Sequence, residues 1–207
     1  MEVDMSKRVY ISADYAEESG DRNVIDVLHS WAEDDLHKVD FVDTAQVASG
    51  SVSDKPDCRI CDLKKEFNAQ INASSAVIFI VGDKTASRTA GSECSRINDQ
   101  YYNCYCTPYK QNSKGSKQCK CLLTSPADPD GDVGYINSYS YLRHEFEQAA
   151  KRNKTIIILY NSLNNQSSWL PAYMKDYEDN AHPFWKRNDS GEKVGDYDYV
   201  KKALDYV

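Results

Sequence analysis

The sequence predicts an α/β protein built on a doubly wound parallel sheet. Short apolar segments rich in β-branched and aromatic residues alternate along the chain with segments of helical periodicity. Two of these apolar segments are continuous runs, as expected for parallel strands covered by helices on both faces. Right-handed crossovers would place the carboxyl ends of all strands at one edge of the sheet, where ligands bind in such folds.

Four segments are predicted as strands because each is short, apolar and closed by polar residues or glycine. They are RVYIS at 8–12, VDFV at 39–42, AVIFIV at Ala76–Val81 and TIIILY at Thr155–Tyr160.

Four segments are predicted as helices because apolar residues recur in them every three or four positions. These residues are Val24, Val27, Leu28 and Trp31; Leu63, Phe67 and Ile71, after Pro56; Leu142, Phe146, Ala149 and Ala150, in 141–152; and Val200, Ala203 and Leu204 near the end.

The composition indicates one globular domain over residues 1–207, with 41% hydrophobic and 28% charged residues. The net charge of −7 argues against nucleic acid as a partner.

No segment is long and apolar enough for a signal peptide or a membrane span, so we expect a cytoplasmic protein without membrane contact. No Gly-x-Gly-x-x-Gly follows the first strand, which argues against a hydride-transferring dinucleotide enzyme.

A polar stretch at 89–138 interrupts the alternation and shows no helical or strand period. We interpret it as an insertion at the ligand edge of the sheet. Two C-x-C pairs within it are candidate ligands of a structural Zn²⁺ ion, although C-x-C is a weaker zinc signature than C-x-x-C. The candidate ligands are Cys104, Cys106, Cys119 and Cys121. A further C-x-x-C, at Cys58 and Cys61, is a redox candidate, for which incidental surface cysteines are the stronger interpretation.

Glu145 is the best candidate for chemistry. On a helical wheel of residues 141–152 it lies at the margin of the apolar stripe, whereas His144 and Glu147 turn further towards water. A carboxylate in the first turns of a helix is also stabilised by the helix dipole, which is the structural alternative to a catalytic role.

Four segments together resemble TIR-like domains, most closely the TIR-like proteins of the bacterial Thoeris anti-phage system. They are KRVYIS at 7–12, FVD at 41–43, INASSAVIFIVGDKT at 71–85 and YLRHEFEQAAKRNKTIIILY at 141–160. In that family an aromatic residue precedes a helical glutamate by four positions, and Tyr141 and Glu145 take those places here, with Arg143 between them. The resemblance covers most of residues 7–161 outside the insertion and implies a flavodoxin-like fold.

The resemblance implies an enzyme that cleaves the nicotinamide–ribose bond of NAD⁺, with Glu145 as the catalytic carboxylate and no required cofactor. Nicotinamide leaves without protonation, so one carboxylate that stabilises the ribosyl cation suffices. Water as acceptor would give ADP-ribose. An acceptor within the nucleotide would give a cyclic ADP-ribose-type signal for a downstream effector. Self-association or a phage-derived trigger would switch the enzyme on.

Further side chains are expected to bind the substrate at the same edge. Ser12 and Tyr15 are assigned to the adenine or the phosphates, and Asp43 to the ribose. Asp14 is a weaker candidate, and for Asp14 and Asp43 a turn-capping role is the stronger interpretation. Tyr141 and Arg143 complete the set of substrate-binding candidates.

The chain departs from the family pattern at two places. Tyr141 stands where the family has a tryptophan, and the insertion separates the third strand from the helix of Glu145. The alternative function is therefore a non-catalytic TIR-like scaffold that binds a nucleotide or a protein partner.

Overall fold

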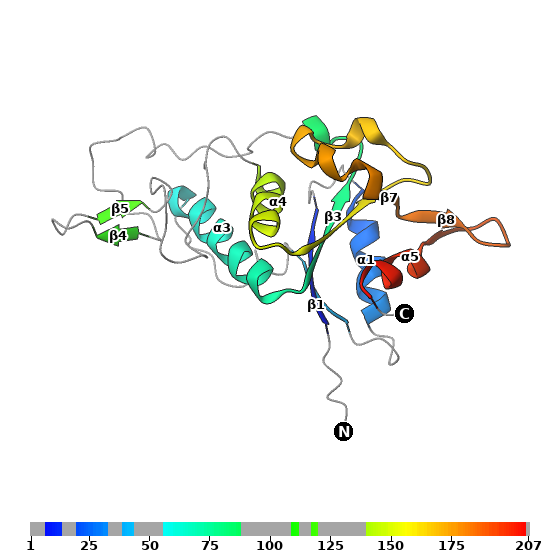
Figure 1. Ribbon diagram of the computed structural model, residues 1–207, viewed down its shortest axis with the longest axis horizontal. Coiled ribbons are helices and arrows are strands. Elements are labelled where there is room, and N and C mark those ends of the chain that lie inside the picture. Colours follow the sequence, from blue (N-terminus) through cyan, green and yellow to red (C-terminus); the bar gives the residue numbers. More distant parts are fainter. Residues whose placement is uncertain are drawn as a thin grey trace, which may run out of the picture.

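A parallel five-stranded sheet forms the centre of the computed structural model, with strand order β2-β1-β3-β6-β7 (Figure 1). The strands are β1 (Lys7–Ser12), β2 (Val39–Asp43), β3 (Ala76–Val81), β6 (Thr155–Tyr160) and β7 (His182–Pro183). This is the flavodoxin-like order, in which the chain reverses its winding between β1 and β3. The predicted doubly wound parallel sheet is confirmed, and its four predicted strands end within one residue of the expected positions.

The structure describes residues 7–13, 20–32, 39–43, 56–87, 109–111, 117–119 and 140–205, without the side chains of 56–62, 109–111 and 117–119. Within these ranges, no helix is both long and apolar enough to cross a membrane.

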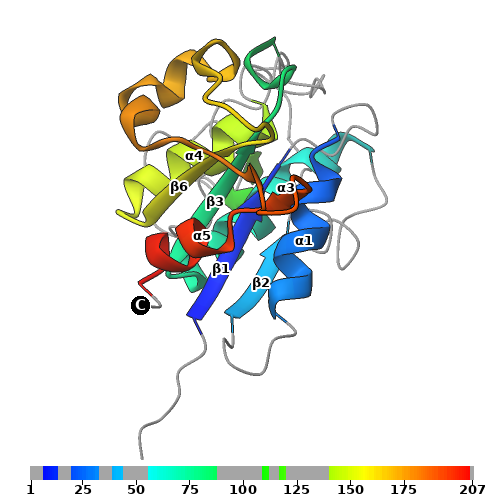
Figure 2. The ribbon, with the colours of Figure 1, turned by 90° about the vertical axis from the view of Figure 1, so that its right-hand side faces the viewer.

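Helices cover both faces of the sheet, as Figures 1 and 2 show. They are α1 (Arg22–Ala32), α3 (Pro56–Ala73), α4 (Tyr141–Lys151) and α5 (Tyr197–Ala203). α1 and α5 pack on one face, and α3 and α4 pack on the other. All four predicted helices are present.

The alternation of β3 shows why a continuous apolar run forms the central strand. All six of its residues are buried. Ala76, Ile78 and Ile80 join the core under α1 and α5, while Val77, Phe79 and Val81 join the core under α3 and α4. Because successive side chains point to opposite faces, a strand between two helical layers needs apolar residues at every position.

The segment after β6 contains structure that the sequence pattern did not predict. It comprises the 3-10 helices η6 (Ser167–Trp169) and η7 (Ala172–Asn180), strand β7, and the hairpin of β8 (Trp185–Arg187) and β9 (Lys193–Gly195). These elements are two or three residues long, except η7, and are too short for a hydrophobic period to reveal them.

Within 89–138, where the sequence shows no strand period, the structure contains one short antiparallel pair. The 3-10 turn η2 (Thr85–Ser87) follows β3, and further on β4 (Tyr109–Gln111) pairs antiparallel with β5 (Lys117–Cys119). Two three-residue strands of polar composition give no periodic signal. The rest of the predicted insertion lies outside the described residues.

Candidate functional site

Ser140 fixes the start of the helix that contains Glu145. Its Oγ accepts a hydrogen bond from the backbone N–H of Arg143 at 3.1 Å and so caps the first turn of α4. Because α4 follows the carboxyl end of β3 and leads back to the amino end of β6, its first turns lie at the carboxyl edge of the sheet. The sequence therefore places Glu145, in the second turn, near that edge.

Both carboxylate oxygens of Glu145 accept hydrogen bonds from side chains of β1. The Tyr10 hydroxyl donates to Oε1 at 2.5 Å, and the Ser12 hydroxyl donates to Oε2. Glu145 is 1% exposed, and Tyr10 and Ser12 are completely buried. Two hydroxyl donors stabilise the charged form of a carboxylate and fix its orientation. The structure thus brings together two of the predicted site residues, Ser12 and Glu145.

The expected position of Glu145 at the margin of a buried face is wrong, because the side chain lies in the interior. The expected direction of His144 is also wrong. His144 is completely buried, and its Nε2 lies 2.8 Å from Oδ1 of Asn68 on α3. The helical wheel assumed that α4 buries only one stripe of residues. In the structure α4 packs against both the sheet and α3, so a wider part of its surface is buried. Glu147 does face outwards, with its side chain 35% exposed.

Further polar side chains are buried on α3 and α4. Lys64 and Asn68, one turn apart on α3, are completely buried, and Gln148 on α4 is 2% exposed. Sequence reasoning missed these residues, as it missed Tyr10. Strand alternation was the available signal for Tyr10, because residues 10 and 12 of one strand face the same side.

Tyr141 and Arg143 lie in the first turn of α4, where they contact aromatic side chains of α3 and η7. The half-buried Tyr141 ring meets Phe67 edge-on, with ring centroids 5.7 Å apart. The Arg143 guanidinium pairs with Glu147 at 3.8 Å and lies 5.6 Å from the centre of the Tyr173 ring. Burial raises the pKa of Tyr173 far above its ordinary value. A hydrogen bond with Ser140 lowers this pKa by less than burial raises it, so the tyrosine stays neutral.

Asp43 lies on the opposite face of the sheet from Glu145. Its Oδ2 is 2.7 Å from Nε2 of His29 on α1, and the residue is 5% exposed. Asp43 shares the strand face of Phe41, which packs under α1. This placement agrees with the structural interpretation of Asp43 and does not bring it to Glu145. Asp14 and Tyr15 lie outside the described residues.

A second buried polar network connects the carboxyl ends of the strands on the α1 face. Asn161, directly after β6, donates from Nδ2 to Oδ1 of the buried Asp21 at 3.0 Å and accepts from the Trp185 indole at 2.7 Å. A Cβ at Gly82 would lie 2.8 Å from Oδ1 of Asp21, so glycine is needed there to admit the carboxylate. This network joins the loops after β3 and β6 to the start of α1.

The zinc prediction falls largely beyond the part of the chain that the structure describes. Cys104, Cys106 and Cys121 lie outside it, and the side chain of Cys119 is not described. Among the side chains that are described, no group of three or more His, Cys, Asp or Glu could hold a metal ion. The zinc site stays a prediction.

The fold and the site define an open parallel α/β protein with a buried glutamate that two hydroxyls of the first strand hold in place. Comparison of the chain with protein-family models, with curated proteins and with solved structures finds no match.

Proposed function

We propose that this protein is a TIR-like, cytoplasmic enzyme that cleaves the nicotinamide–ribose bond of NAD⁺ with Glu145 as its catalytic carboxylate. One observation supports this most strongly. A carboxylate near the carboxyl edge of a flavodoxin-like sheet is oriented by the hydroxyls of Tyr10 and Ser12, on a strand that flanks the point where the winding reverses. In open parallel sheets that point is the usual ligand site.

The chemistry needs one fixed negative charge. When the C1′–N bond breaks, its electron pair leaves with nicotinamide, and positive charge develops on the ribose. The Glu145 carboxylate stabilises that charge without reorganisation, because its position is set before the reaction. Water then adds to C1′ and releases a proton, giving ADP-ribose; a nucleophile of the same nucleotide gives a cyclic isomer instead.

The burial of Glu145 adds a condition to this proposal. A side chain that is 1% exposed cannot meet a ribose until neighbouring groups move aside. We therefore expect the resting protein to be inactive and to need self-association or a phage-derived trigger. In the anti-phage role that the resemblance implies, the nucleotide product would then reach a separate effector.

The same burial favours a second candidate, a TIR-like scaffold without activity. Both Glu145 oxygens already have protein donors, which is also the arrangement of a purely structural buried carboxylate. In that case the carboxyl edge would bind a nucleotide or a protein partner without cleaving anything.

Incubation of the purified protein with NAD⁺, alone and with components of infecting phage, separates the two candidates. The enzyme releases free nicotinamide in at least one condition. A scaffold leaves NAD⁺ intact in every condition, and calorimetry would then show whether NAD⁺ binds at all.

A further inference from the structure

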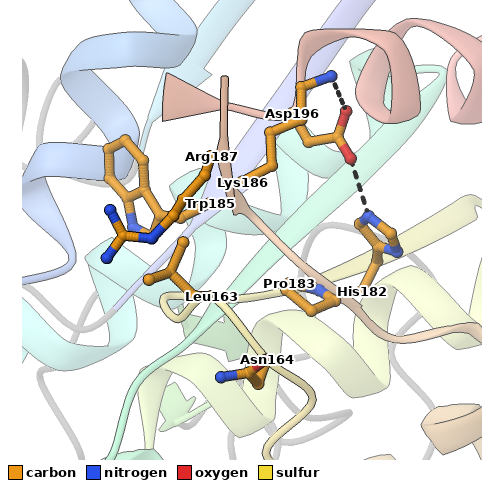
Figure 3. A pocket seen from close by; sticks show the side chains of 8 residues that line it. All are labelled: Leu163, Asn164, His182, Pro183, Trp185, Lys186, Arg187 and Asp196. Atoms are coloured by element: carbon orange, nitrogen blue, oxygen red, sulfur yellow. Dashed lines mark hydrogen bonds and ion pairs between the residues drawn. The ribbon is translucent and has the colours of Figure 1, made fainter. Parts of the chain in front are cut away.

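An open pocket of about 480 Å³ lies at the carboxyl ends of β6 and β7, and none of the residues around Glu145 lines it (Figure 3). Its volume is within the range of small-molecule sites. One wall is the loop after β6, and the other is the chain from β7 into β8. No part of the proposed NAD⁺ chemistry uses it.

The backbone fixes both walls against each other. β7 pairs with the end of β6, and the chain then continues along the next loop: the N–H of Phe184 donates to the Tyr160 carbonyl at 2.8 Å, and that of Trp185 donates to the Ser162 carbonyl at 3.2 Å. The Trp185 indole is held by its hydrogen bond to Asn161. The pocket is thus formed in advance of any ligand.

Some charged side chains of the pocket are already paired with each other. Asp196 accepts from Lys186 at 2.9 Å and lies 3.1 Å from Nε2 of His182, contacts that Figure 3 marks. Lys186 also donates to Asp198 at 3.0 Å. Hydrogen bonds to Asp196 and Asp198 raise the pKa of Lys186, so it remains charged and paired.

The other group of side chains is open to a ligand. Within the described part of the chain, the Arg187 guanidinium makes one hydrogen bond, from Nη1 to the Gly191 carbonyl at 2.6 Å. The Asn164 carboxamide makes no hydrogen bond to any described residue. Leu163 is the one large hydrophobic side chain among the described residues that is left exposed, at 36%. The pocket therefore combines a cation with unused donors, an amide and apolar surface.

We propose that this pocket binds a small organic anion whose phosphate or carboxylate pairs with Arg187 and whose apolar or planar body lies against Leu163 and Trp185. A guanidinium offers a planar fork of donors that matches both anions. With Lys186 already neutralised by two carboxylates, Arg187 is the lining cation that keeps unused donors, and Lys193, whose Nζ lies 4.2 Å from the centre of the Trp185 ring, adds positive charge beside it. The chain as a whole carries a net charge of −7 and repels anions, so the local positive charge of Arg187 would favour anion binding at this pocket.

Nuclear magnetic resonance of the indole N–H of Trp185, assigned with Trp185→Phe, tests the proposal without any activity assay. Phenyl phosphate and benzoate serve as probes that share an aromatic body and differ in the anion; inorganic phosphate lacks the body. We expect a saturable shift with at least one aromatic probe and weaker binding of inorganic phosphate. Arg187→Gln should weaken binding about tenfold, because hydrogen bonds to a charged group are lost.

Lys202→Gln is the matched control, since it removes the same positive charge from an exposed position on α5 outside the pocket. It should leave the affinity unchanged. Leu163→Ser should weaken phenyl phosphate but not inorganic phosphate. The proposal is overturned if neither aromatic probe gives a saturable shift, if Arg187→Gln binds as tightly as wild type, or if inorganic phosphate binds as tightly as phenyl phosphate.

Discussion

At the scale of single residues, the arrangement that matters most is the pair of hydroxyls on Glu145. Tyr10 and Ser12 are two positions apart on one strand, so both side chains point to the face covered by α4. There they donate hydrogen bonds to Glu145 of α4. The sequence indicated Ser12 and Glu145 but not their contact, because the two lie 133 positions apart in the chain. Only the packing of α4 across the sheet joins them.

Tyr10→Phe should weaken both stability and activity, because it removes one donor from a buried carboxylate. We expect the free energy of unfolding to fall by about 1.5–3 kcal/mol. Nicotinamide release under activating conditions should fall about tenfold to a hundredfold, since the carboxylate loses its fixed orientation. Urea unfolding and a nicotinamide assay measure the two effects.

Tyr160→Phe is the control for this prediction. Tyr160 is 1% exposed in the same hydrophobic core, but it lies at the end of β6, and its surroundings include Glu178 and Ser167 instead of Glu145. It should leave turnover unchanged. Full activity in Tyr10→Phe, or equal losses in both variants, would contradict the role assigned to the Tyr10 hydroxyl.

At the scale of secondary-structure elements, the long periodic segments were predictable and the short ones were not. α1, α3 and α4 show clear apolar faces, and β3 is buried throughout. β7, in contrast, has two residues, one of them Pro183, and gains its place only by pairing with β6. His144 was misplaced because a wheel describes one face, whereas α4 is buried against both α3 and the sheet.

Asp196 holds three short elements together, and its contribution should depend on pH. It caps α5 through the N–H of Tyr199 and contacts His182 of β7 and Lys186 of β8. Although burial opposes the charge, these hydrogen bonds hold its pKa below the ordinary value of 3.8. The stabilisation is therefore present above that value and is lost as the pH falls through the lower value of the folded state.

Asp196→Asn should accordingly lower the free energy of unfolding by about 1–3 kcal/mol at neutral pH and by progressively less in acid. Urea unfolding of wild type and variant across this pH range measures the difference. Asp198→Asn, which removes an 85% exposed carboxylate from the same lysine, should have little effect at any pH. This account would be disproved if wild type and Asp196→Asn had the same free energy of unfolding at neutral pH, or if the difference between them stayed constant down to strong acid.

At the scale of the whole molecule, the burial of Glu145 leads us to expect that the proposed enzyme is inactive until it is triggered. The specific rate of nicotinamide release should rise with protein concentration if self-association exposes Glu145, or with an added phage component if a trigger does. Initial rates over a dilution series test the first case. Full turnover by a dilute monomer would contradict the expectation of a closed resting state.

The central claim is that Glu145 supplies the charge that stabilises the ribosyl cation. The most direct test compares nicotinamide release by wild type, Glu145→Gln and Glu147→Gln under activating conditions, after unfolding measurements show that all three are folded. Glu147 is the matched control because it is on the same helix, half-exposed and paired with Arg143. We predict that Glu145→Gln loses about 10²–10³ in rate, roughly 3–4 kcal/mol, and that Glu147→Gln keeps wild-type turnover. Wild-type turnover in Glu145→Gln, or an equal loss in both variants, would contradict the claim.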